Sequence, residues 1–213
     1  DFILCGNGAS ELIYAYCEAV RPKRAMELAP TFSEYSLALR RTGCEVVRFA
    51  LKQEENFDLR ENFLPILAHE ELDALFLCNP NNPTGVVYDE ATIKAMAAIL
   101  EKKEKEFGTS IVLISDEPYR ELAYGGVEVP FVTKYYHNAV VGYSYSKSLS
   151  VPGERIGYVV IPDEVDDSAA LIGAATIANR VIGCVNAPSL VQKVIKYCIE
   201  HEVTVDLETY EKN

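Results

Sequence analysis

The sequence predicts an α/β fold, a three-layer αβα sandwich around a mostly parallel central sheet. Apolar, strand-like runs alternate along the chain with segments of helical periodicity, which is the pattern of strand–helix–strand units. Several of these runs are apolar throughout, as expected for strands that are covered on both faces. The segments expected as strands are 25–29, 45–51, 72–78, 110–115, 139–145 and 156–162, and the opening residues read as a further strand and turn.

Helices are expected between and after these strands, and several of their ends carry clear signals. Asp89 is a suitable N-cap for a helix that Gly108 ends, and Gly43 ends an earlier helix, since glycine readily adopts the left-handed conformation found at helix ends. The expected helices are 10–20, 33–41, 89–107, 163–180 and 189–201. The charged end of the chain, which begins at residue 201, also permits a helix.

Composition bounds the class of protein. The chain has 213 residues, of which 49% are hydrophobic, so a single α/β domain with a sizeable core is possible. A formal net charge of −12 argues against nucleic acid or an anionic membrane as partner, because both require a basic surface. No apolar run approaches a membrane span and no signal peptide opens the chain, so we expect a cytoplasmic location.

The cysteines and histidines predict no metal site. The six cysteines form no C-x-x-C pair and mostly lie in apolar runs, where reduced thiols serve as small hydrophobic side chains. The three histidines are scattered beside polar residues and lack the spacing of zinc ligands.

Candidate functional residues are sought directly after the strands, because open α/β sheets bind ligands beyond the carboxyl ends of their strands. Asp116 opens "DEPY", and a carboxylate there is either paired, used in chemistry or a turn residue. Asn82 lies in the rigid turn "NPNNPTG", which is either a plain loop or a holder for an amide. Phe32 in "PTFSEY" either packs in the core or stacks on a flat ligand.

The stretch "GNGASEL" places glycines before a helix start, where free backbone N–H groups suit an anion. It is not a P-loop, and Glu11 stands where a dinucleotide-binding G-x-G-x-x-G motif requires its third glycine. A phosphate group is therefore plausible, and a dinucleotide is not favoured.

The stretch "SYSKSLSVPGERIGY" places Lys147 at the end of an expected strand, with Arg155 eight residues later. Lysine is costly to bury, so this amine is either solvated or chemically active. The S-x-x-K motif of penicillin-recognising serine hydrolases fits the letters, but that motif wants its serine opening a helix, and its partner motifs S-D-N and K-T-G do not occur. The remaining interpretation is a lysine that forms a Schiff base with pyridoxal 5'-phosphate (PLP), a cofactor that also needs an acid and a phosphate-binding group.

Five motifs, in this order, make the chain resemble the fold-type I PLP-dependent aminotransferases of class I/II: "GNGAS", "PTFSEY", "NPNNPTG", "DEPY" and "SYSK" followed by the arginine. The resemblance covers nearly the whole chain. It implies that residues 1–213 are the PLP-binding large domain, without the N-terminal arm and the C-terminal small domain of the family. It also implies a homodimer in the full-length protein, with amino acids and 2-oxo acids as substrates.

The resemblance further implies a role for each matching residue. Lys147 would be the Schiff-base lysine and move the substrate proton, and Asp116 would keep the ring nitrogen of the cofactor protonated. Asn82 and Tyr119 match the donors to the phenolic oxygen, and Phe32 matches the stacking ring. The residues that match the phosphate-binding group are Ala9, Ser10, Ser144, Ser146 and Arg155.

Two residues are candidates for substrate contacts. Asn82 is one. Arg180 is the other, because it precedes "VNAPS" much as an arginine of aspartate aminotransferases precedes a similar turn and crosses to the partner's site. In this sequence the spacing is one residue longer, so the match is looser than those of the cofactor residues.

Transfer of an amino group by a ping-pong mechanism through pyridoxamine phosphate is the leading functional hypothesis. A second keeps the cofactor but breaks a different bond, as in a threonine-phosphate decarboxylase or a carbon–sulfur β-lyase. "PTFSEY" would suit that decarboxylase, or a histidinol-phosphate aminotransferase, equally well. The non-enzymatic alternative is a PLP-fold domain that senses ligands, and the alternative without PLP is a Rossmann-like nucleotide binder.

Overall fold

The computed structural model describes residues 3–59, 62–206 and 208–212. These residues contain a seven-stranded sheet with the strand order β1-β7-β6-β5-β4-β2-β3. Its strands are β1 Ile3–Gly6, β2 Arg24–Ala29, β3 Glu45–Ala50, β4 Ala74–Cys78, β5 Val112–Asp116, β6 Ala139–Ser144 and β7 Gly157–Val160. Five neighbouring strands of the sheet run parallel to one another: β6, β5, β4, β2 and β3. The strand β7 is antiparallel to both of its neighbours, β6 and β1. The predicted α/β class with a mostly parallel sheet is confirmed.

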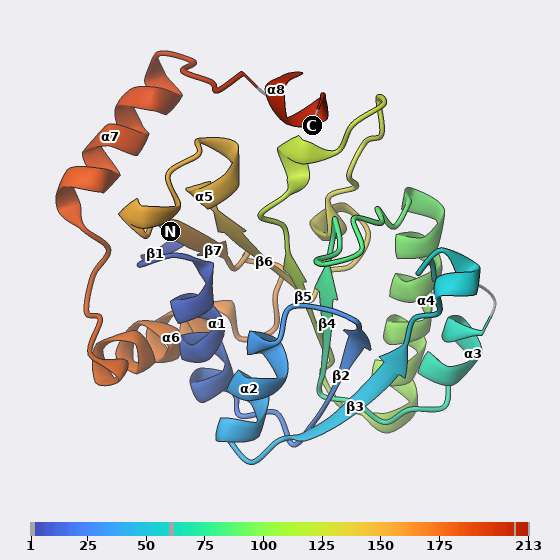
Figure 1. The fold of residues 1–213 in the computed structure, drawn as a ribbon. Helices are drawn as coiled ribbons and strands as arrows, with labels where there is room; N and C mark the ends of the chain where they lie inside the picture. Colours follow the sequence, from blue (N-terminus) through green and yellow to red (C-terminus); the bar gives the residue numbers. More distant parts are fainter. Residues whose placement is uncertain (1–2, 60–61, 207, 213) are drawn as a thin grey trace.

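Helices cover both faces of this sheet and make it the middle of three layers. Figure 1 shows α1, α2 and α6 on one side of the sheet and α3 and α4 on the other, with α7 at the periphery. The helices are α1 Ala9–Val20, α2 Glu34–Arg41, α3 Phe63–Leu67, α4 Glu90–Phe107, α5 Tyr145–Ser148, α6 Ser168–Ile182, α7 Ser189–Glu200 and α8 Glu208–Glu211. None of the helices among the described residues combines the length and apolarity needed to cross a membrane.

Two apolar cores lie on the two faces of the sheet, and β4 shows why its sequence is apolar throughout. Leu75 and Leu77 pack with α3 and α4, whereas Ala74 and Phe76 pack with α1 and α2. Successive side chains of a strand point to opposite faces, so a strand between two helical layers has no solvent-facing position. All five residues of β4 are accordingly buried.

The three helix ends for which the sequence carries a clear signal are confirmed. The Asp89 carboxylate accepts a hydrogen bond from the backbone N–H of Thr92 at 2.8 Å, and Gly108 ends α4 in the left-handed conformation with φ 66°. Gly43 likewise has φ 84° just beyond α2. The helix expected over 163–180 instead begins at Ser168, because the residues before it form turns that lead through Asp167 at φ 53°.

The strand register brings the functional candidates to one edge of the sheet. Asp116 pairs with Cys78 on one side and with Gly142 on the other, so β4, β5 and β6 end together. Ser144, the last residue of β6, pairs with Gly157, the first residue of β7. Because β7 runs antiparallel, the loop that precedes it reaches the same edge that the other strands reach at their ends. We call this the carboxyl edge, after the parallel strands that end there.

Candidate cofactor site

A cavity of about 200 Å³ opens at the carboxyl edge. It is lined by all the residues that the sequence predicts to bind cofactor: Ala9, Ser10, Phe32, Asn82, Asp116, Tyr119, Ser144, Ser146, Lys147 and Arg155. These residues come from segments far apart in the sequence, and the sheet topology is what gathers them. Four further residues complete the lining, and the sequence analysis did not single them out: Tyr35, Cys78, Pro118 and Pro152.

Asp116 is a buried carboxyl group with half of its hydrogen-bonding capacity unused. It is the last residue of β5 and only 4% exposed. Its Oδ2 accepts a hydrogen bond from the Tyr35 hydroxyl at 2.6 Å, whereas its Oδ1 has no partner among the described residues. Burial raises the pKa of Asp116 to about 6, with the Tyr35 bond opposing that shift and the neighbouring Glu117 adding to it. A buried acceptor without a donor is costly unless a ligand supplies one.

Glu117, the next residue, is also a buried carboxylate, but both of its oxygens have partners in the protein. Its Oε1 accepts a hydrogen bond from the Ser115 hydroxyl at 2.8 Å, and its Oε2 forms an ion pair with Arg120. Burial raises the pKa of Glu117, and the guanidinium of Arg120 opposes that shift. Of the two adjacent acids, Glu117 is satisfied within the fold, whereas Asp116 lines the cavity and has one oxygen without a partner among the described residues.

Lys147 lies in the short helix α5, close to two other candidates. Its Nζ is 5.7 Å from the centre of the Tyr119 ring, and the Asn82 side-chain amide donates to the Tyr119 hydroxyl at 3.1 Å. Ser144 begins α5 as its N-cap, since its hydroxyl accepts from the backbone N–H of Ser146 at 3.3 Å. Ser144 thus ends a strand and also opens a helix, as the S-x-x-K motif wants, so only the missing partner motifs oppose that interpretation.

The start of α1 forms a second part of the cavity, with the character of an anion site. Gly8 stands at the N-cap with φ 88°, and no side chain caps the helix. A Cβ added to Gly8 would lie 2.2 Å from Nη2 of Arg155, so only glycine lets this guanidinium approach the helix start. A Cβ at Gly157 would similarly lie 2.8 Å from the backbone nitrogen of Ala9. Two glycines therefore allow a cation to lie beside free N–H groups, an arrangement that favours a phosphate.

PLP fits this set of groups. The unpartnered Oδ1 of Asp116 suits a protonated ring nitrogen, the helix start with Arg155 suits a phosphate, and Lys147 offers an amine in the same lining. The flat ring of Phe32, which is half-buried, lies in the same lining.

Arg180 is the one predicted site residue that lies apart from the cavity lining. It is an exposed residue of α6, two residues before the end of that helix. The sequence analysis expects Arg180 to act in the site of a partner subunit, and that expectation stays a prediction.

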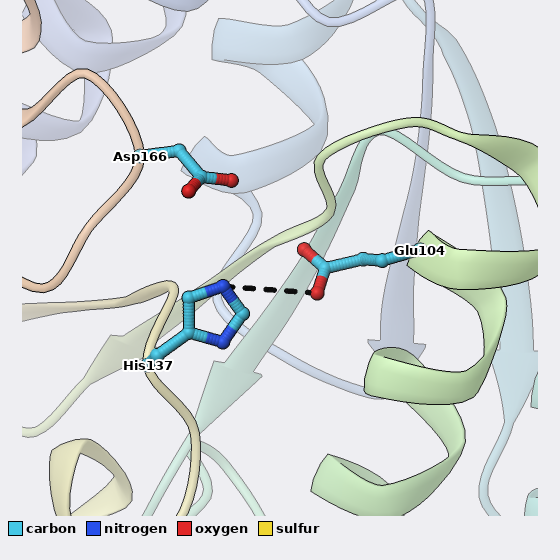
Figure 2. Close-up of side chains that lie close together, drawn as sticks. All are labelled: Glu104, His137 and Asp166. Carbon is cyan, nitrogen blue, oxygen red and sulfur yellow. Dashed lines mark ion pairs between the residues drawn. The ribbon is translucent and has the colours of Figure 1, made fainter.

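A second cluster of titratable side chains lies at the opposite edge of the sheet. Figure 2 shows Glu104, His137 and Asp166, whose ligand-type atoms all lie within 4.8 Å of one another. Nε2 of His137 is 3.8 Å from the Glu104 carboxylate. The sequence analysis missed this cluster because the three residues share no short spacing.

Both carboxylates of this cluster are already held by the fold. Glu104 accepts a hydrogen bond from the backbone N–H of Ile111 at 2.9 Å, and Asp166 accepts one from the Ser110 hydroxyl at 2.7 Å. His137 and Asp166 are exposed. The cluster is therefore stabilised without a ligand, unlike Asp116.

Comparison with known proteins agrees with the geometry of the cavity. The family of class I and II aminotransferases matches residues 1–206. A crystal structure of an amino transferase from Eubacterium rectale is 43% identical in sequence with a TM-score of 0.89, and the match covers 99% of this chain and 53% of that one.

Two curated relatives differ in the reaction that they are named for. Threonine-phosphate decarboxylase of Salmonella typhimurium is 34% identical over 77% of this chain and 43% of the relative. Histidinol-phosphate aminotransferase of Thermotoga maritima is 30% identical over 92% of this chain and 50% of the relative. The chain thus spans about half the length of the relatives that it matches. It belongs to the class I and II aminotransferase family, whose members are PLP-dependent enzymes of fold type I.

Proposed function

We propose that the full-length protein is an aminotransferase that moves an amino group between an amino acid and a 2-oxo acid by a ping-pong mechanism. The observation that carries this proposal is the open Oδ1 of buried Asp116 in a cavity that Lys147 also lines. PLP bound there supplies an aldehyde that condenses with amines and a ring that withdraws electrons.

Lys147 and Asp116 are the residues assigned to the chemistry. The Lys147 amine forms the covalent link to the cofactor and, once a substrate has displaced it, moves the proton at the substrate α-carbon. Asp116 keeps a proton on the ring nitrogen, because its desolvated carboxylate forms no ion pair with a lysine or arginine among the described residues and gains most from a charged N–H partner. The two roles require opposite ends of one ligand, and both residues line the same cavity, which supports this assignment.

The other lining residues orient the cofactor. Burial raises the pKa of Tyr119, so its hydroxyl stays protonated and is able to donate to the phenolic oxygen together with the Asn82 amide. Phe32 stacks on the ring. The phosphate is held by Ala9, Ser10, Ser144, Ser146 and Arg155.

Residues 1–213 correspond in this proposal to the PLP-binding large domain. Support comes from the match, which spans nearly all of this chain but about half of its relatives. The rest of the full-length protein would supply the arginine that holds the substrate α-carboxylate, and a second subunit would receive Arg180. We propose a cytoplasmic homodimer.

Decarboxylation of a phosphorylated amino acid is the second candidate. It is favoured by two relatives named threonine-phosphate decarboxylase, one of them putative, at 34% and 35% identity over about three quarters of this chain. The cofactor residues serve both reactions equally, because both need the same electron-withdrawing ring. The residues that orient the bond to be broken decide between them.

The deciding experiment uses the full-length holoenzyme. Single amino acids are added in turn, and the absorbance of bound PLP is followed together with 2-oxo acid production by mass spectrometry. A parallel series uses O-phosphothreonine and O-phosphoserine and measures released CO₂. Aminotransfer predicts stoichiometric conversion to the amino form of the cofactor and its reversal by a 2-oxo acid. Release of CO₂ without production of a 2-oxo acid would show decarboxylation in place of aminotransfer. A full-length protein that binds no PLP would contradict both candidate functions.

A further inference from the structure

Among the described residues, the Asp116 side chain accepts a single hydrogen bond, and it comes from Tyr35. The two residues are 81 positions apart, and the O···O distance is 2.6 Å. Tyr35 also lines the cavity, although none of the sequence motifs assigned it a function.

The Tyr35 hydroxyl is held rigidly. Tyr35 lies in the first turn of α2 and is 1% exposed. Its ring packs against Phe76 of β4 with the ring centres 5.3 Å apart, and against Phe32 edge-on at 5.6 Å. Because aromatic rings pack against the Tyr35 ring on two sides, the position of its hydroxyl is fixed. That hydroxyl binds Oδ2 of Asp116, so Oδ1 is the oxygen that stays free.

The charges around Asp116 show why this one donor matters. Glu117, the residue directly after the strand, disfavours the Asp116 carboxylate. Burial raises the pKa of the Cys78 thiol of β4 to about 12 and also raises the pKa of Tyr119, so neither becomes charged near neutral pH. Lys147 also lines the cavity, and the proposed function commits its amine to the cofactor. Tyr35, whose own pKa is raised well above its usual value by burial, remains a donor throughout.

We infer that Tyr35 is a positioning residue for Asp116: its hydroxyl engages Oδ2, leaves Oδ1 free for the ring nitrogen of the cofactor and keeps the carboxyl in its charged form. This inference rests on the proposed function. Without the hydroxyl, neither oxygen of Asp116 has a donor from the described residues, and the balance moves toward the neutral acid. A neutral acid holds the ring nitrogen of the cofactor in its protonated form less well.

The test is Tyr35→Phe in the full-length holoenzyme, which keeps the ring contacts and removes the hydroxyl. With PLP labelled with ¹⁵N in its ring, the ¹⁵N resonance should move from the pyridinium position toward that of neutral pyridine. The kcat should fall roughly ten- to a hundredfold, as expected for the loss of a hydrogen bond to a charged group, with a smaller change in KM. Asp116→Asn gives the neutral end point of the ¹⁵N scale.

Tyr136→Phe is the matched control. The Tyr136 hydroxyl is also buried and donates at 2.6 Å, but to the backbone oxygen of Ile111 at the opposite edge. It should lose a similar amount of stability and leave the ¹⁵N resonance unchanged. A Tyr35→Phe holoenzyme whose ¹⁵N resonance, and its dependence on pH, match the wild type would overturn the inference. A wild-type protein that binds no PLP would overturn the proposed function instead.

A second measurement decides the case in which Tyr35→Phe loses its cofactor. In the cofactor-free protein, Asp116 holds its proton to a higher pH when the Tyr35 donor is absent. The free energy of unfolding should therefore go on falling to a higher pH in Tyr35→Phe than in the wild type, whereas the pH at which the fall begins is set by the unfolded chain and should not change. Coincident profiles would overturn the inference.

Discussion

The two edges of the sheet each gather titratable side chains, but they do so in different ways. At the carboxyl edge, Asp116 is buried, and one of its oxygens has no partner among the described residues. At the opposite edge, the carboxylates of Glu104 and Asp166 both accept hydrogen bonds from the protein, and the cluster with His137 opens to solvent (Figure 2). One edge is incomplete without a ligand, and the other is complete.

The difference shows that a buried polar atom without a hydrogen-bond partner indicates a binding site better than the number of polar side chains does. A solvated carboxylate costs the fold little, because water satisfies what the protein leaves open. A buried acceptor without a donor costs about 1–3 kcal/mol, which a fold sustains where a ligand restores the lost bond. At the carboxyl edge, Gly8 and Gly157 also leave a space that a side chain would close.

The largest effect that would test this comparison is expected from Asp116→Asn. The amide cannot hold the proton of the ring nitrogen, so the cofactor should stay bound while turnover falls by several orders of magnitude, each factor of ten being about 1.4 kcal/mol. Single-turnover deamination in the full-length holoenzyme measures the effect. Glu104→Gln at the opposite edge is the control, and a near wild-type rate in Asp116→Asn would refute the role.

The cost of burying Asp116 should also appear in the stability of the cofactor-free protein. Its pKa is raised from 3.8 to about 6, so the folded protein binds a proton across that interval after the unfolded chain has lost it. The free energy of unfolding should therefore fall by about 3 kcal/mol as pH rises through the interval. Urea titrations at several pH values should show this fall in the wild type and not in Asp116→Asn. Equal profiles would mean that the carboxyl is not buried as described.

Arg155→Ala should act on affinity and leave the chemistry intact. Removing a charged donor from a phosphate costs about 1.5–3 kcal/mol, which is about ten- to a hundredfold in the Kd of PLP. Excess PLP should then restore much of the rate. If saturating PLP restored nothing and the substrate KM rose, Arg155 would be a substrate ligand.

The smallest effect is expected at the opposite edge. His137→Gln removes one member of an exposed cluster, so the free energy of unfolding should change by less than about 0.5 kcal/mol. The Kd of PLP and the kcat should remain at their wild-type values, and a chelator should not alter either. A loss of PLP binding in His137→Gln would contradict the claim that only the carboxyl edge takes part in binding the cofactor.

Sequence motifs were sufficient to find most of the cavity, because each one ties a residue type to the end of a predicted strand. Asp116 and Asn82 follow buried runs, and parallel strands end at one edge, so their gathering follows from the fold class. Arg155 is different, since it precedes its strand. It reaches the edge because β7 runs antiparallel, which alternation of strands and helices does not reveal.

Tyr35 could not be found in this way. A buried aromatic residue in a helix is usual for core packing, and the contact with Asp116 joins positions 81 residues apart. The Glu104 cluster escaped for the same reason. Its residues come from a helix and two loops, and only the folded chain brings their side chains together.

Reduction of the full-length holoenzyme with borohydride, followed by peptide mapping, tests the central claim most directly. Borohydride fixes a cofactor to the amine that it is bound to, so the label reports the position of PLP without any assumption about the substrate. We predict a single label on Lys147, the one lysine that lines the cavity, and its loss in Lys147→Ala. A label on Lys134, or on any lysine outside the cavity, would contradict the account.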